Sequence, residues 1–87
     1  MNENIIYTTS AVCYSYDISQ DTINEMVSWG IANPVGNNPE KWLFSHKDYV
    51  RIGKASRFKS ELDINIPGAA LALQLLDDIQ NIRNKRY

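Results

Sequence analysis

The chain has 87 residues, of which 44% are hydrophobic, and nine basic against ten acidic residues give a net charge of −1. This size fits one small domain, and the composition is that of a folded chain rather than a disordered one. The single Cys13 excludes an intramolecular disulfide and argues against a cysteine-based zinc site. The N-terminus lacks the basic and apolar regions of a signal peptide, and no apolar run approaches the roughly 20 residues of a membrane span. We therefore expect a cytoplasmic protein.

The charges are distributed unevenly along the chain. Residues 1–45 hold one base and five acids, a net charge of −4, whereas residues 46–87 hold eight bases and five acids, a net charge of +3. An acidic first half argues against generic nucleic-acid binding by that half. The basic excess is concentrated in Lys47, Arg51, Lys54, Arg57 and Lys59.

The first elements predicted are a short strand at residues 3–8 and a short helix at residues 10–16. Thr9 or Ser10 is the expected N-cap of that helix. The side chains expected to pack inward from it are Ala11, Val12 and the three residues from Tyr14 to Tyr16.

A second helix is predicted after a turn at residues 17–18, with Ser19 as its N-cap. Ile23, Met26 and Val27 recur at i, i+3 and i+4 and form an apolar stripe facing the first helix. Gly30 is suited to end the helix in the left-handed conformation.

Residues 31–45 are predicted to form a short β-hairpin or loop, because Pro, Gly and Asn cluster between two apolar pieces. Residues 31–32 would supply one arm and residues 42–44 the other, with Trp42 in the core. Ser45 then caps a helix over residues 46–62. The expected inward positions of that helix are Tyr49, Ile52, Ala55, Phe58 and Leu62.

The last predicted helix begins near Pro67, a residue suited to a first helical turn, and runs to about Arg83. Ala72, Leu75, Ile79 and Ile82 recur at spacings of 3, 4 and 3 and form a stripe that we call the C-terminal seam. Leu71, Leu73 and Leu76 widen the apolar surface beyond what one small core needs. We expect residues 1–66 to form the core of the domain and residues 67–87 a dimerisation or packing helix.

Residues 19–30 stand where a helix-turn-helix protein would have its recognition helix, yet they contain no Lys or Arg. DNA-reading helices rely on these bases for contacts to phosphates and base edges. The positions expected to be exposed here are Gln20, Asp21, Asn24, Glu25 and Ser28. Asp21 and Glu25, one turn apart, would repel phosphate.

Three stretches carry a family resemblance: DISQDTINEMVSWGIANP, KWLFSHKD and, above all, ELDINIPGAALALQLLDDIQNIR. The order of elements resembles the MerR-type winged helix-turn-helix, and these stretches resemble most closely the chaperone modulators of the CbpM family. The resemblance covers about residues 5–84. It implies a mainly α, MerR-like winged helix-turn-helix with a short β-hairpin wing and a C-terminal amphipathic helix.

The resemblance implies an adaptor rather than an enzyme. The residues themselves offer no Ser-His-Asp arrangement, Gly-rich phosphate loop or metal-ligand spacing, so we expect no catalytic site, metal or cofactor. Members of this family bind the J-domain of a DnaJ-like co-chaperone called CbpA and restrain its work with the DnaK-class chaperone. J-domains present a basic second helix, so an acidic face would compete for it. We expect a partner face made of Asp17, Asp21, Asn24 and Glu25, with Glu40 adding charge, and a homodimer through the C-terminal seam.

Several residues have an ordinary structural interpretation beside a functional one. Asp77 and Asp78 point about 100° apart on a helix, so a solvated face or an ion pair is favoured over a metal site. His46 is expected as a surface residue of a first helical turn. Trp29 fits either the core or an exposed interface anchor. The stripe Lys47, Arg51 and Lys54 is expected to be a solvated face rather than a phosphate contact.

Two other hypotheses stay open from the sequence. One is a MerR-like transcriptional regulator that binds DNA through a divergent surface, although Lys41 is the only base in the wing. The other is a structural module with an unrelated protein partner. A pull-down with J-domain proteins of the same organism would separate the second hypothesis from the chaperone modulator.

Overall fold

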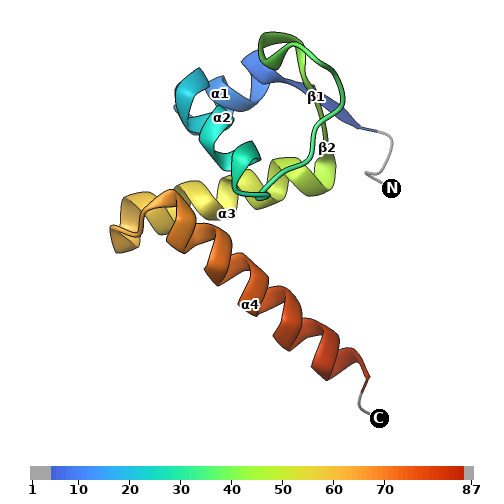
Figure 1. Ribbon diagram of the computed structural model, residues 1–87, viewed down its shortest axis with the longest axis vertical. Helices are drawn as coiled ribbons and strands as arrows, with labels where there is room; N and C mark the ends of the chain where they lie inside the picture. The colour runs from blue at the N-terminus through green and yellow to red at the C-terminus, as the bar shows by residue number, and fades with distance from the viewer. Residues whose placement is uncertain (1–4, 86–87) are drawn as a thin grey trace.

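The computed structural model describes residues 5–85. Two short helices and a small sheet lie on one side of a central helix, and the last helix crosses the central helix, also contacts the second short helix, and projects away from the body (Figure 1). The mainly α fold with a short two-stranded sheet is confirmed. The elements in chain order are β1 (Ile6–Thr8), α1 (Thr9–Tyr16), α2 (Gln20–Ser28), the 3₁₀ turn η1 (Pro39–Lys41), β2 (Leu43–Ser45), α3 (His46–Leu62) and α4 (Ile66–Asn84).

Each α-helix begins after a side chain that caps it. The Ser19 and Ser45 hydroxyls accept hydrogen bonds from the N–H groups of Thr22 and Asp48, the third residues of α2 and α3, so both predicted caps are confirmed. The cap of α1 is Thr8 rather than Thr9 or Ser10, so that prediction was wrong by at least one residue. The reason lies in a tertiary contact: Thr9 is buried, and its hydroxyl donates to the Pro39 carbonyl at 2.9 Å.

The small sheet pairs two segments that are far apart in the chain. β1 runs antiparallel to β2, with Tyr7 opposite Phe44. The expected arm at residues 31–32 is therefore wrong: Ile31 and Ala32 are buried core residues, and β1 takes the place opposite residues 43–45. The wing is closed instead by Val35, which exchanges two backbone hydrogen bonds of 3.0 Å with Leu43.

The core gathers apolar side chains from all four helices and from β2. Four expected inward positions lie outside it: Ala11, Ser15 and Leu62 are exposed, and Tyr14 is 90% exposed. Helix α1 has only eight residues and presents one narrow face to the core, and Leu62 lies at the end of α3 beyond the packed layer. The largest fully buried side chains include Phe44, Ile23, Met26, Ile31, Ile52 and Val12.

An aromatic cluster joins β1, α1 and the start of α3. The Tyr7 and Tyr49 rings stack at a centroid distance of 4.0 Å, and the Tyr16 hydroxyl donates to the Tyr49 carbonyl at 2.8 Å. Gly53 permits this arrangement, because a Cβ there would lie 2.6 Å from the Tyr16 hydroxyl oxygen. His46, expected at the surface, is half-buried, with its Nδ1 2.9 Å from the Tyr7 hydroxyl.

Arg51 is a structural residue rather than part of a solvated stripe. Its Nε donates to the Ile31 carbonyl at 2.7 Å, and its Nη1 pairs with Asp77 on α4 at 2.7 Å. Only 18% of its side chain is exposed. Arg51 thus links α3 both to the segment after α2 and to α4. For Asp77, an ion pair was one of the two structural interpretations favoured over a metal site, and the structure shows that ion pair.

Helix α4 packs on the body through its first half only. Ile66, Ala69 and Leu73 are buried, whereas every residue from Gln74 to Lys85 is exposed. Leu73 therefore belongs to the core and does not widen the outer apolar surface as expected. Across residues 5–85, no helix has the length and apolarity that crossing a membrane requires.

We predict that Gly53→Ala destabilises the fold by about 1–3 kcal/mol, because the added methyl group must displace the Tyr16 ring from a packed position. Urea denaturation measures the change. In a Tyr16→Ala background the same substitution should be neutral or stabilising, since Ala is the better helix former and the clash is gone. If Gly53→Ala destabilised the fold equally with and without the Tyr16 ring, the clash with Tyr16 would not be the cause of the destabilisation.

Stability should also fall above pH 10 because of Tyr16. Burial, its hydrogen bond to Tyr49 and the neighbouring tyrosines raise the pKa of Tyr16 above the ordinary value of 10. The unfolded chain loses this proton near pH 10 while the folded chain keeps it, so stability is present below pH 10 and decreases above it. The slope should not exceed about 1 kcal/mol per pH unit, because the ring is only partly buried.

The measurement is urea denaturation between pH 8 and pH 11. Tyr16→Phe should flatten the decrease, and Tyr14→Phe, which changes an exposed tyrosine in the same helix, should leave it as in the wild type. An identical pH profile in all three proteins would assign the alkaline instability to other groups.

Candidate protein-partner interface

The exposed side of α2 is acidic. Asp21 and Glu25 are both exposed and stand one turn apart, where side chains share a helix face. No Lys or Arg occurs in residues 1–40. The apolar stripe predicted for this helix is present on the other side: Ile23 and Met26 are fully buried and Val27 is half-buried.

Two polar residues of α2 are less accessible than expected. Asn24, a member of the expected partner face, and Gln20 are half-buried. The Gln20 side-chain amide donates to the Asn24 Oδ1 at 2.9 Å and lies 3.4 Å from the Pro39 carbonyl. Through these contacts Asn24 orients the Gln20 side chain towards Pro39 and so helps to hold α2 against the wing. The helical spacing alone did not indicate this role.

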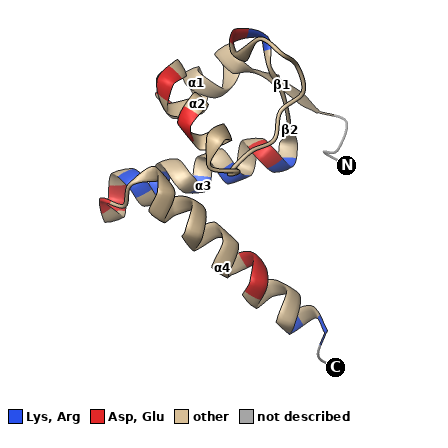
Figure 2. Ribbon diagram, viewed as in Figure 1, with Lys and Arg blue, Asp and Glu red and all other residues tan. Residues whose placement is uncertain are grey.

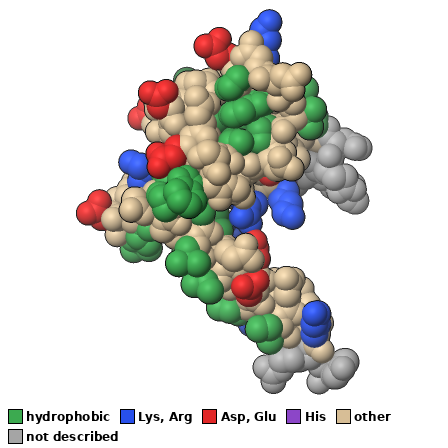
Figure 3. All heavy atoms as spheres, viewed as in Figure 1, with side chains coloured by type: hydrophobic (Ala, Val, Ile, Leu, Met, Phe, Trp, Pro, Cys, Tyr) green, Lys and Arg blue, Asp and Glu red, His purple; other side chains and the backbone are tan. Residues whose placement is uncertain are grey.

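Asp17 extends the acidic surface beyond α2. It lies in the left-handed conformation, with φ of 54°, and its N–H donates to the Cys13 carbonyl as the cap of α1. The exposed Asp17 carboxylate therefore stands at the sharp turn that leads into α2. Acidic positions follow this turn and α2 along one side of the molecule (Figure 2), and acidic side chains project from the same side in the space-filling view (Figure 3).

The two tryptophans have different environments. Trp29, the residue after α2, is 54% exposed. Of the two environments expected for it, the core and an exposed surface, the structure shows the exposed one. Trp42 is half-buried, as part of the wing: its Nε1 donates to the Gly36 carbonyl at 3.0 Å, and its ring meets Phe44 edge-on. An exposed aromatic ring beside the acidic surface is a side chain of the kind that anchors protein interfaces.

A second exposed surface lies on α4. Leu75, Ile79 and Ile82 of the C-terminal seam are 51–63% exposed, and Ala72 is half-buried. Leu71 and Leu76 are exposed beside them. At 100° per residue, Ile79 points about 120° away from the buried Leu73, so the seam faces away from the core.

Reactive side chains are dispersed over the fold. Cys13 is half-buried on α1, and burial raises the pKa of its thiol, which disfavours the reactive thiolate. His46 contacts Tyr7, and Asp77 is paired with Arg51. Among residues 5–85 no three His, Cys, Asp or Glu side chains come together in a group that could hold a metal ion.

Comparison with known proteins gives the family. Residues 7–86 match the family described as MerR HTH family regulatory protein. The chain is 36% identical over 74 residues to a chaperone modulatory protein CbpM of Pseudomonas entomophila. The aligned residues make up 85% of this chain and 73% of the relative. It is 30% identical over 84 residues to a CbpM of Escherichia coli, covering 97% and 83% of the two chains. The chain belongs to the CbpM family.

Membership of this family confirms the resemblance that the three sequence stretches indicated and the MerR-like class of the fold. A CbpM of Citrobacter koseri is 28% identical over 98% of this chain, so the similarity includes both the acidic helix α2 and the projecting helix α4. The family name supports a role as a chaperone modulator with a chaperone-related partner, and both family names describe regulation rather than catalysis.

We predict that the chain binds no duplex DNA sequence-specifically at physiological salt, because α2 carries acids where a DNA reader carries bases. Fluorescence anisotropy with a labelled duplex and its scrambled counterpart tests this expectation. Sub-micromolar binding to one duplex over the other would contradict it, and a steep loss of that binding with salt would show that phosphate contacts carry it.

Proposed function

We propose that this CbpM-family chain binds the J-domain of a CbpA- or DnaJ-like co-chaperone in the cytoplasm and thereby inhibits the work of that co-chaperone with the DnaK-class chaperone. The surface proposed for this contact is the partner face, made of Asp17, Asp21, Asn24 and Glu25. The observation that carries the proposal is an exposed acidic edge along the α1–α2 turn and α2, in a stretch of 40 residues without a base.

Charge complementarity supports this choice of partner. A J-domain uses a basic helix to contact its chaperone, and an acidic surface attracts such a helix and speeds the encounter. The charges on the partner face come from exposed side chains that can reorient towards a partner: Asp21 and Glu25 have no basic residue within 4 Å in the part of the chain described. The contact needs no rearrangement of the core, because the apolar side of α2 stays buried.

The backbone of the partner face is held rigidly, which favours specific binding over a loose electrostatic contact. Asp17 is fixed by the tight turn after α1, Ser19 caps α2, and the Gln20–Asn24 pair contacts the wing at Pro39. Trp29 adds an exposed aromatic ring at the end of the same helix. A basic helix of the partner would then meet both the charges and an apolar anchor.

The C-terminal seam is proposed to form a homodimer. Residues 1–66 would form the winged helix-turn-helix core, and residues 67–87 the helix that joins two copies. On α4, the exposed side chains of Leu75, Ile79 and Ile82 form an apolar surface that does not pack against the core. About two heptads of contact are available, so the dimer should be modest in strength unless the two bodies also touch.

A MerR-like DNA-binding regulator is the second candidate, and the family match over residues 7–86 is the observation in its favour. Against it stand the acidic α2 and a wing whose only base is Lys41. The anisotropy experiment described above separates the two functions.

The decisive test of the partner face is a double charge reversal. Changing Asp21 and Glu25 to Lys should slow association with the J-domain of a CbpA-like protein and remove most of the salt dependence of the rate. The fold should survive, since both side chains are exposed. Stopped-flow or surface plasmon resonance with the purified J-domain at several salt concentrations measures the effect, with a pull-down of the full co-chaperone as a first step.

Reversal of Glu61 and Asp78 to Lys is the matched control, because both are exposed helical acids outside the partner face and outside the C-terminal seam. The control should change the association rate much less than the double reversal on α2. If the wild-type chain captures no J-domain protein, the proposal fails in favour of an unrelated partner. If it binds but the α2 reversal changes neither rate nor salt dependence, the contact lies on another surface.

Dimerisation can be tested through Ile79. Ile79→Lys should shift the protein towards monomer, because each large seam side chain contributes about 1.5–3 kcal/mol when it is buried and a lysine in the interface would be desolvated. Asn81→Lys, on another side of α4, is the control and should leave the dimer intact. Analytical ultracentrifugation measures the state, and circular dichroism checks that α4 stays helical. A wild-type chain that sediments as a monomer at high micromolar concentration would refute the dimer.

A further inference from the structure

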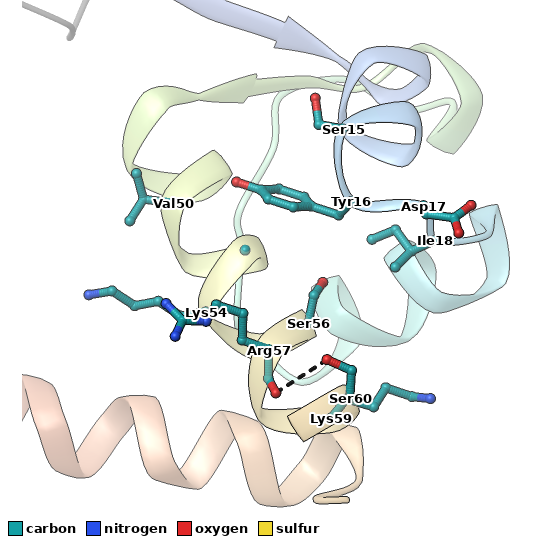
Figure 4. A pocket seen from close by; sticks show the side chains of 11 residues that line it. Ser15, Tyr16, Asp17, Ile18, Val50, Lys54, Ser56, Arg57, Lys59 and Ser60 are labelled. Carbon is teal, nitrogen blue, oxygen red and sulfur yellow. Dashed lines mark hydrogen bonds between the residues drawn. The ribbon is translucent and has the colours of Figure 1, made fainter. Parts of the chain in front are cut away.

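An open hollow of about 860 Å³ lies between the turn that joins α1 to α2 and the outer side of α3. Its volume is in the range of small-molecule sites. Figure 4 shows how it is built: residues 15–18 form one wall, and residues of α3 from Val50 to Ser60 form the other. It lies outside the C-terminal seam and has only Asp17 in common with the partner face.

Cations dominate the α3 side of the hollow. Lys54, Arg57 and Lys59 line it and are exposed, whereas Asp17 is the only acid in its lining. Asp17 projects on the side opposite Lys54 and Arg57 (Figure 4). In the part of the chain described, the one carboxylate within 4 Å of these cations is Glu61, whose distance to Arg57 is 3.5 Å on an exposed surface. Such a loose, solvated pair leaves the guanidinium able to turn towards an anion.

The lining of the hollow also includes hydroxyl groups from both walls. Ser15, Ser56 and Ser60 all line the hollow. The Ser56 Oγ is buried and has no hydrogen-bond partner within residues 5–85, and its side chain points from α3 towards the wall formed by Tyr16 and Ile18 (Figure 4). Buried hydroxyls nearly always have a partner, and because this one is closed off from solvent, a ligand in the open hollow would have to displace neighbouring side chains to reach it.

The wall opposite α3 contains an aromatic ring that is fixed in place. The Tyr16 ring is held by its hydrogen bond to the Tyr49 carbonyl and by the close approach that Gly53 permits. Ile18 adds an aliphatic side chain to this wall, and Val50 adds one on the α3 side of the hollow. A rigid aromatic and aliphatic surface opposite several cations suits a ligand that combines a flat or apolar body with a negative group.

From these features we infer that the hollow between the α1–α2 turn and α3 binds a small organic anion, with its apolar body against Tyr16 and Ile18 and its phosphate or carboxylate group at Lys54 and Arg57. The inference does not rest on the proposed function, because it concerns the chain alone. Since the hollow is open on one side, the ligand stays partly in water, and the dissociation constant should be about 0.1–1 mM for a nucleotide-sized anion.

The test uses the full chain labelled with ¹⁵N and three probes: adenosine monophosphate, adenosine and inorganic phosphate, each titrated to about 10 mM. Adenosine monophosphate should shift the amide resonances of residues 15–18 and 50–60 together and saturably. Adenosine and phosphate should each bind at least about fivefold more weakly, because each retains only one of the two contacts.

A matched pair of variants separates a site from general charge attraction. Lys54→Ala should weaken binding of adenosine monophosphate about fivefold, whereas Lys47→Ala, which removes one exposed charge from the same helix outside the hollow, should change it by less than about 1.5-fold. Unchanged amide spectra in the wild type would overturn the inference. So would equal losses in the two variants, or binding of adenosine or phosphate alone as tightly as the complete anion.

Discussion

The packing of α1, the small sheet and α4 against α3 is the constraint on which this structure depends. Ile52, Gly53 and Ala55 give α3 a flat buried side on which α1, the sheet and α4 can approach closely. Small residues at this contact bring the backbones together, and Gly53 in particular leaves the space that the Tyr16 hydroxyl occupies. A chain of 87 residues has little apolar area with which to offset its conformational entropy, so its few close contacts carry much of the stability.

This central packing determines which surfaces are free. Helix α2 uses its apolar stripe against the core and turns Asp21 and Glu25 outwards, and α4 uses Leu73 against the core and turns Leu75 and Ile79 outwards. One exposed surface is acidic and the other apolar, and they belong to different helices. Because the two surfaces belong to different helices, the proposed contacts with a basic partner and with a second copy of the chain would not need the same side chains.

Arg51 connects these regions. Its contacts with the Ile31 carbonyl and with Asp77 link the segment that follows α2 to the projecting helix α4. The guanidinium thus adds a polar link to the apolar contacts of Ile66, Ala69 and Leu73 that pack α4 on the body. The MerR-like architecture is thus retained, while the bases that let such a fold read DNA are missing from α2. Regulation through a protein partner is the use of the fold that its charges favour.

The sequence alone determined the features that arise from neighbouring residues. Ser19 and Ser45 as caps, α3 over residues 46–62 and Pro67 in the first turn of α4 follow from local hydrogen bonding and spacing. The acidic character of α2 follows from its composition. Only the tertiary structure decided that Ile31 and Ala32 join the core, that Tyr14 and Leu62 face solvent, and that Arg51 pairs with Asp77 across 26 residues. Those outcomes depend on how helices of different length approach one another in space, and helical periodicity carries no information about a partner so distant in the chain.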